Sequence, residues 1–296
     1  MPLRRLARPI AFAAALCAAS GLAVGDPPAA QAASGLRARH EALRERLERN
    51  AFGRPVEIES REQDNHLAGD VYAVVQYPFA TVDGALDKPG TWCEVLILPF
   101  NTKYCSASHD ATQLKLRIGR KAQQAARDAY PIEFSYRVAA QEPDYLRVEL
   151  AAPTGPLGTR DYRITLEATP LDDNRSFIHL GYAYGFGAVS RIAMETYLST
   201  IGAHKVGFTV VGRSADGSPE FVGGLLGATE RNTMRYFLAI DAYLGTLSAP
   251  PQERLTRRLD TWFSASERYP RQLHEMDRGE YLALKEHEAK DVNAEL

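Results

Sequence analysis

The sequence lacks most of the motifs that assign an activity directly. Its 296 residues contain no nucleophile elbow, no HExxH zinc motif and no catalytic set of His, Cys and Asp. The formal net charge is only −2, so no excess of positive charge favours nucleic acid as a partner. No internal repeat or long low-complexity run is present. What remains is an ordinary globular composition, with 45% apolar and 24% charged residues.

Cofactor motifs are also absent. The segment Gly185 to Ser190 contains two glycines after an expected strand, which superficially resembles a dinucleotide-binding turn. Its third position is Ser190, and no parallel βαβ unit surrounds it. We therefore expect no bound cofactor, and the glycines more simply permit a sharp turn.

Long apolar runs are missing except near the N-terminus. Three arginines among the first eight residues precede an apolar stretch at residues 10–24, which is too short for a comfortable membrane span. The sequence Ala30-Gln31-Ala32 then forms an A-x-A cleavage site. We interpret residues 1–32 as a secretory signal, cleaved after Ala32, with an uncleaved anchor as the alternative. The mature protein is expected in the periplasm.

Cysteine is scarce, with three in the chain. Removing the signal would take away Cys17 and leave Cys93 and Cys105. No His lies at ligand spacing near them, so we expect no metal site. In an oxidising compartment this pair is expected to form a disulfide, with two buried free thiols as the alternative.

The clearest pattern that is present is a ladder of alternating segments between Leu114 and Tyr184. Apolar residues alternate with charged ones such as Lys115, Glu133 and Arg147. Because side chains in a strand point alternately to the two faces, this pattern predicts an antiparallel sheet with one polar and one apolar face. The five predicted strands contain Leu114-Leu116-Ile118, Ile132-Phe134-Tyr136-Val138, Leu146-Val148-Leu150, Tyr162-Ile164-Leu166-Ala168 and Ile178-Leu180-Tyr182.

The flanking segments read mostly as helices. A helix capped by Ser34 is followed by a polar connector, Arg54 to Leu67, and then by a strand that Pro78 ends. After the ladder, a helix at 188–201 is expected to turn Val189 and Ile192 inward. Two strand-like segments, 206–211 and 221–226, lead to a long amphipathic helix at 229–247, and a helical tail begins beyond Pro250.

This order resembles the helix-grip fold of the START-like superfamily (SRPBCC; Bet v 1-like, polyketide-cyclase-like). The local match is VYAVVQYPFATVDGALDKPGTWCEVL, Val71 to Leu96: a strand, a Pro-Phe helix start, a short helix ending near Asp-Lys-Pro, and a Trp in the next turn. The resemblance implies an α+β fold in which a curved antiparallel sheet of about seven strands wraps around a long C-terminal helix. Residues 67–248 would form this domain, with an insertion at about 185–227. Extra helices would lie at 33–66, together with the connector, and in the tail at 249–296.

The resemblance also implies a hydrophobic tunnel between the sheet and the long helix. One helix covers a strip roughly 10 Å wide, much less than a seven-stranded sheet at about 4.8 Å spacing, so other elements or a ligand must fill the difference. Tyrosine suits such a tunnel because its ring is apolar and its hydroxyl seeks a partner. The expected ligand-binding residues are Trp92, Tyr136, Tyr182, Tyr184, Arg235, Tyr236, Ile240 and Tyr243.

The expected function is the binding or carriage of a hydrophobic small molecule or lipid, without covalent chemistry. Members of the superfamily also include cyclase-type and hydrolase-type enzymes, which is one alternative. The other is an interaction module with a closed core, whose tail would present Trp262 and Phe263 to a partner. A basic stretch at 115–127 is consistent with transient contact with a membrane surface, although a solvated sheet face also explains it.

Overall fold

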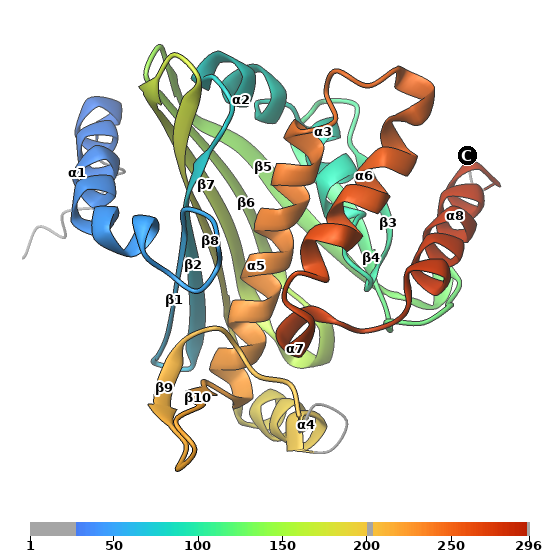
Figure 1. The fold of residues 1–296 in the computed structure, drawn as a ribbon. Coiled ribbons are helices and arrows are strands. Elements are labelled where there is room, and N and C mark those ends of the chain that lie inside the picture. The colour runs from blue at the N-terminus through green and yellow to red at the C-terminus, as the bar shows by residue number, and fades with distance from the viewer. Residues whose placement is uncertain (1–27, 200–203, 295–296) are drawn as a thin grey trace, which may run out of the picture.

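The computed structural model of the chain describes residues 28–199 and 204–294, and its centre is an antiparallel sheet (Figure 1). Eight strands lie in the order β1-β2-β8-β7-β6-β5-β4-β3. They are β1 (Val56–Gln63), β2 (His66–Val75), β3 (Thr102–Ala107), β4 (Gln113–Ile118), β5 (Tyr130–Glu142), β6 (Tyr145–Thr154), β7 (Arg160–Asp172) and β8 (Arg175–Gly185).

The five ladder strands are confirmed as β4 to β8, each paired antiparallel with the next along the chain. Their inward residues face one another in register, so that Leu150 lies opposite Ile164 and Leu166 lies opposite Leu180. All four of these side chains are fully buried. The period-two pattern of the sequence therefore corresponds directly to the inner face of the sheet.

The polar connector predicted at 54–67 is wrong, because this segment contains β1 and the first residues of β2. Only Val56 and Ile58 of β1 are buried, while its other side chains are half-buried or exposed. A strand at the sheet edge needs few inward apolar residues, and the charges of β1 hid its alternation in the sequence. The sheet therefore has eight strands rather than about seven.

Helices cover both faces of this sheet, and α5 (Gly224–Leu244) lies across the concave one (Figure 1). It begins five residues earlier than predicted because residues 224–226 belong to the helix and not to a strand. The other helices are α1 (Ala29–Glu48), α2 (Phe79–Leu86), α3 (Pro89–Leu96), α4 (Ala188–Ser199), α6 (Pro251–Ser266), α7 (Pro270–Leu273) and α8 (Arg278–Ala294), with short 3-10 turns η1 (Ala126–Asp128) and η2 (Pro156–Gly158).

The first helix packs on the outer face of the sheet. Leu36, Leu43 and Leu47 of α1 form a small second core with Tyr145 and Phe177. The helix begins at Ala29 rather than at Ser34, so its first turn overlaps the predicted cleavage site. Residues 1–27, which contain most of the predicted signal, lie outside the described residues.

The segment between β8 and α5 forms α4 and a two-stranded hairpin of β9 (Val210–Arg213) and β10 (Pro219–Phe221). The predicted inward face of α4 is wrong, since Val189 is 81% exposed and Ile192 is 65% exposed. Ser190 and Met194 lie on the side that packs against the protein instead. Both faces of this helix carry apolar residues, so the sequence pattern alone did not distinguish them.

The C-terminal tail is part of the main core. Trp262 and Phe263 of α6 are buried, and the Trp262 ring centroid lies 5.0 Å from Phe100 and 5.3 Å from Tyr281. This packing contradicts the interaction module whose exposed tail would present the two aromatic residues. No helix among the described residues is long and apolar enough to cross a membrane.

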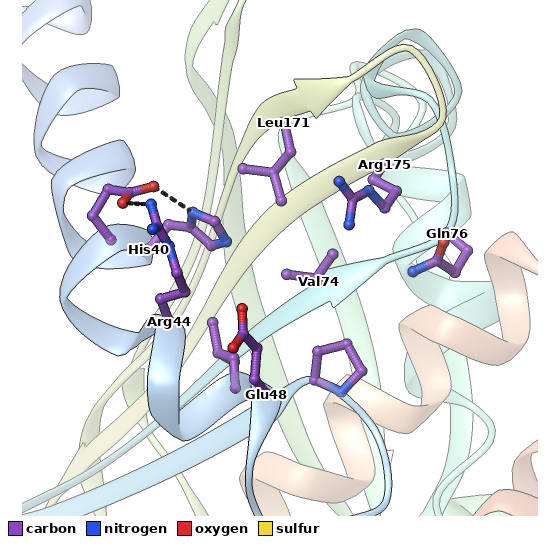
Figure 2. A pocket seen from close by; sticks show the side chains of 10 residues that line it. His40, Arg44, Glu48, Val74, Gln76, Leu171 and Arg175 are labelled. Atoms are coloured by element: carbon purple, nitrogen blue, oxygen red, sulfur yellow. Dashed lines mark hydrogen bonds and ion pairs between the residues drawn. The ribbon is translucent and has the colours of Figure 1, made fainter.

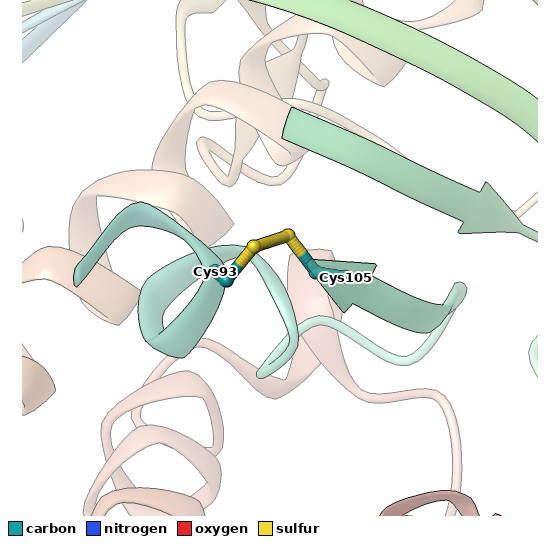
Figure 3. Close-up of a disulfide and its surroundings, with 2 residues drawn as sticks. All are labelled: Cys93 and Cys105. Atoms are coloured by element: carbon teal, nitrogen blue, oxygen red, sulfur yellow. A yellow bond between two sulfur atoms is a disulfide. The ribbon is translucent and has the colours of Figure 1, made fainter. Parts of the chain in front are cut away.

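The predicted disulfide is confirmed (Figure 3). It joins Cys93 of α3 to Cys105 of β3 across a Cα–Cα distance of 5.2 Å. The bridge ties the short helices that precede β3 to the far edge of the sheet. In the chain-entropy description, a loop of this length contributes roughly 3 kcal/mol to stability.

Candidate ligand site between the sheet and α5

The position of α5 is set by a close approach to β2. Gly69 lies opposite the helix, where a Cβ atom would fall 2.4 Å from Thr233 Oγ1 and 3.1 Å from Thr229 Cγ2. Thr233 is fully buried, and its hydroxyl donates to the Thr229 carbonyl at 2.9 Å. Only glycine at position 69 lets the helix lie this near the strand.

Beside this contact, four tyrosines form a cluster. Tyr162 and Tyr184 stack with centroids 5.4 Å apart and an interplanar angle of 14°. Tyr182 lies 5.6 Å from Tyr184 and 5.4 Å from Tyr236 of α5. Three rings therefore come from strands β7 and β8, and the fourth comes from the helix that covers them.

The hydroxyls of this cluster fall into two classes. Tyr162 shares a hydrogen bond of 2.8 Å with Thr159 Oγ1, and a bond to Thr229 opposes the rise in the pKa of Tyr184 that burial causes. Tyr182 and Tyr236 have no hydrogen-bond partner among the described residues. Burial raises the pKa of Tyr236 to about 12 and that of Tyr182 well above its ordinary value. Both hydroxyls therefore stay protonated at neutral pH.

A third unpaired hydroxyl lies at the other end of the sheet. Tyr136 is 9% exposed, and its hydroxyl oxygen is buried without a partner. Burial, followed by the negative charge of Asp87, raises the pKa of this tyrosine. Asp87 Oδ1 is itself buried without a hydrogen bond, and Lys88 Nζ lies 3.9 Å from it. Two neighbouring polar atoms near the end of α2 therefore lack a hydrogen bond.

The remaining predicted residues are packed into the core. Trp92 Nε1 donates to the Leu86 carbonyl at 3.0 Å, and the Tyr243 hydroxyl lies 3.2 Å from Thr91 Oγ1. Ile240 is fully buried within the same core. These three residues link α3 and α5, and their polar atoms are already satisfied by the protein.

Arg235 does not join the tyrosine cluster. Its guanidinium forms an ion pair with Glu275, in the segment between α7 and α8. Adjacent residues of a helix point about 100° apart, so the Arg235–Glu275 ion pair lies to one side of Tyr236. The predicted residues are thus divided among a tyrosine cluster, a packed core and a charged cluster.

Sequence reasoning missed a charged site on the outer face of the sheet. His179 donates through Nε2 to Asp70 Oδ1 and through Nδ1 to Glu167 Oε2, both at 2.8 Å. Its ring stacks on Tyr72 with centroids 4.5 Å apart. Although burial opposes protonation, the two carboxylates raise the pKa of His179 to about 9.

His179 points away from the apolar face, as the strand alternation predicts. With both ring nitrogens protonated and bonded to carboxylates, the imidazolium has no lone pair to accept a proton. This arrangement suits a structural clamp between β2, β7 and β8 rather than a general base. Its partners are 109 and 12 residues away in sequence, so only the sheet register reveals them.

A surface pocket beneath α1 provides a contrast with the tyrosine cluster (Figure 2). It has a volume of about 400 Å³, and its lining includes His40 and the charged residues Arg44, Glu48 and Arg175. Burial and the nearby arginines lower the pKa of His40. None of the predicted ligand-binding residues lines this pocket.

The strand order and the helix across the concave face define the architecture. The chain has a helix-grip fold, an antiparallel sheet that holds one long helix. No protein-family model matches it, and no curated protein matches it in sequence.

Solved structures that resemble this chain include norcoclaurine synthase from Thalictrum flavum, in complex with a transition-state analogue. It is 13% identical over 50% of this chain and 88% of its own, with a TM-score of 0.33. A START superfamily protein from Mycobacterium smegmatis is 12% identical over 46% of this chain and 92% of its own, with a TM-score of 0.31. A conserved protein from Geobacillus kaustophilus is 12% identical over 60% of this chain and 95% of its own, with a TM-score of 0.34. These identities and TM-scores are low. The assignment of the helix-grip fold therefore rests on the strand order and on the position of α5.

Proposed function

We propose that this protein binds a hydrophobic small molecule, such as a lipid, between α5 and the inner face of the sheet. The observation that carries the proposal is the cluster of tyrosine rings between the sheet and α5, together with the buried hydroxyl of Tyr136, which has no hydrogen-bond partner. A buried hydroxyl without a partner costs about 1–3 kcal/mol, and a polar group of a ligand would remove that cost. The apolar rings of the cluster would provide most of the binding energy, at roughly 25 cal/mol per Å².

The tyrosine cluster is the preferred position for the ligand. Tyr162 and Tyr236 are only half-buried, so the cluster remains accessible from outside although burial raises the pKa of both side chains. Helix α4 lies beside this end of α5, and its Met194 and Leu198 pack against the core. Helix α4 would then act as the cover of the ligand.

The cyclase or hydrolase alternative needs a titratable side chain in the interior that can exchange protons. Glu230 of α5 is fully buried, but its carboxylate accepts hydrogen bonds from the backbone amides of Phe208 and Thr209 and from Ser60 Oγ. It is thereby committed to holding the segment before β9. No specific observation therefore favours catalysis over binding.

We also propose that the protein acts in an oxidising compartment such as the periplasm. The Cys93–Cys105 disulfide supports this location, because such bonds persist outside the reducing cytosol. Residues 1–32 also support export, because they combine a positively charged start, an apolar stretch and an A-x-A cleavage site. Mass spectrometry of the protein purified from the periplasmic fraction, with the N-terminus determined, tests both points.

The binding proposal is tested with the neutral probe N-phenyl-1-naphthylamine, whose amine can donate to a tyrosine hydroxyl. Tyr236→Phe should lower its affinity by about 2- to 12-fold, through loss of one hydrogen bond. The same substitution should change the free energy of unfolding of the empty protein by less than about 0.5 kcal/mol, because Tyr236 is only half-buried. A functional hydroxyl thus changes binding and leaves stability nearly unchanged.

Tyr281→Phe is the matched control. The Tyr281 hydroxyl is buried and donates to the Leu98 carbonyl at 2.9 Å, far from α4. This substitution should lower stability by about 1 kcal/mol and leave probe affinity unchanged. If the probe does not bind, and organic extraction followed by native mass spectrometry finds no co-purified lipid, the binding proposal is wrong.

A further inference from the structure

A pocket of about 470 Å³ lies where α3, β3, α6 and α8 meet. Helix α8 packs against both α6 and β3, so the C-terminal tail forms one wall of this pocket (Figure 1). The volume falls in the range of pockets that bind small molecules. Among its described lining residues, none belongs to the tyrosine cluster, so the pocket is separate from the site beneath α5.

Much of the pocket wall is apolar. Ile97 of α3 and the α6 residues Leu255 and Leu259 line it, and so does the Cys93–Cys105 disulfide. Leu255 is 43% exposed, whereas Leu259 is buried. Covering the exposed part of this wall with an apolar ligand group would be favourable, because apolar surface would be removed from water.

The charged side chains on the wall do not balance. Among the described residues that line the pocket, the charged ones are Arg254, Arg258, Lys285, Glu94 and Glu288. Arg258 forms an ion pair with Glu94, and Lys285 forms one with Glu288 at 2.8 Å. These two pairs cancel, so the charge of Arg254 is left over.

Arg254 is half-buried and only partly used by the protein. Its Nε donates to the Ala249 carbonyl at 2.9 Å, which fixes the base of the guanidinium. Its two terminal nitrogens have no hydrogen-bond or ion-pair partner among the described residues. The guanidinium therefore has free donors on the wall of the pocket.

Neither carboxylate on the wall is available to neutralise this arginine. The side chain of Glu288 is 4% exposed and is held by two buried lysines, Lys285 and Lys103, at 2.8 and 2.7 Å. Glu94 accepts from the buried side chain of Arg258, which also lies over the Tyr243 ring. The protein thus leaves the balancing negative charge to a ligand.

We propose that this pocket binds a small aliphatic carboxylate, with the carboxylate on Arg254 and the alkyl chain along Leu255 and Leu259. A carboxylate carries a single negative charge, which matches the one arginine without an ion pair. Its two oxygens also suit the paired donors of a guanidinium. The alkyl chain would cover the apolar wall, which a small hydrated anion cannot do. The site does not depend on ligand binding beneath α5.

Isothermal titration calorimetry with octanoate, at neutral pH and constant ionic strength, tests the site. The expected result is saturable binding that Arg254→Gln weakens by about tenfold or more, because a charge-assisted contact is lost. Octan-1-ol has the same chain length without the charge, so its affinity should be equal for the wild type and Arg254→Gln. Leu255→Ala should weaken the binding of both ligands by about threefold or more, because apolar contact is removed.

Arg257→Gln is the matched control. Arg257 lies on the same helix, but its side chain is 59% exposed and paired with Glu253, and it is not among the described residues that line the pocket. This substitution should leave octanoate affinity unchanged. Circular dichroism establishes that each variant is folded.

A competition experiment separates this pocket from the site beneath α5. Octanoate affinity that is unchanged in the presence of saturating N-phenyl-1-naphthylamine supports the pocket, whereas displacement by the probe places octanoate beneath α5 and overturns the proposal. The proposal is also wrong if millimolar octanoate gives no saturable binding, or if folded Arg254→Gln binds it as tightly as the wild type. Equal weakening of octanoate and octan-1-ol by Arg254→Gln would likewise contradict it.

Discussion

Replacing Gly69 with alanine should separate α5 from the sheet at their closest contact. The added Cβ would lie 2.4 Å from Thr233 Oγ1 and 3.1 Å from Thr229 Cγ2, both closer than ordinary van der Waals contact. Thr233 cannot easily rotate away, since its side chain is β-branched, fully buried and bonded to the Thr229 carbonyl. Either α5 or β2 must therefore move.

Overpacking of a dense core by a single methyl group costs about 1–3 kcal/mol, and the two collisions place Gly69→Ala near the upper end of this range. Urea unfolding followed by circular dichroism measures the loss as a lower midpoint with an unchanged slope. Because the displaced helix carries Tyr236, the affinity for N-phenyl-1-naphthylamine should also fall.

Two further variants identify the cause. Thr233→Ala removes the colliding oxygen, so the double variant with Gly69→Ala should recover part of the lost stability, with a coupling of about 0.5–3 kcal/mol. Gly84→Ala in α2 is the control, because nothing lies within 4 Å of its added Cβ, and it should stabilise by about 0.5–1 kcal/mol. If Gly69→Ala is as stable as the wild type, the close approach of α5 to β2 is not a determinant of the fold.

Two other predictions concern the outer face and the tail. The folded pKa of His179 is raised to about 9, so its stabilising contribution is complete below its unfolded pKa of about 6.5 and disappears as the pH rises through 9. Urea unfolding at several pH values should show this loss, of up to roughly 3 kcal/mol, in the wild type and not in His179→Gln; parallel pH profiles would contradict it. Trp262→Ala should cost about 3–5 kcal/mol, whereas Leu255→Ala on the exposed side of α6 should cost less than about 1 kcal/mol. Equal unfolding midpoints for these two variants would mean that the tail is not part of the main core.

Local pattern predicted the central part of this fold. The alternation in β4 to β8 specifies which side chains enter the core, because a strand has a fixed period of two. The short helix α2 and the Cys93–Cys105 bridge were predicted from equally local features. The strands and the helix depend on residues that are neighbours in the sequence. The bridge joins the only two cysteines that remain after the expected signal is removed.

The errors arose where two physical descriptions fit the same local pattern. Edge strand β1 carries charges on its outer face and only two inward apolar residues, so it resembled a connector. Helix α4 has apolar residues on two faces, and Ile192 lies on the one that the rest of the fold leaves exposed. In both cases the neighbouring elements determine whether the segment pairs as a strand or which of its faces is buried. The sequence of the segment alone does not specify those neighbours.

The sequence by itself determined the sheet, its inner face, the long helix and the tyrosines that lie between them. Only the tertiary structure decided which of those tyrosines find a hydroxyl partner, and it left Tyr182 and Tyr236 without one among the described residues. It also joined Arg235 to Glu275, 40 residues away, and His179 to Asp70, 109 residues away. Periodicity encodes whether a side chain is buried, but the partner of a polar group depends on how distant segments meet, and that is set by the packing of the whole chain.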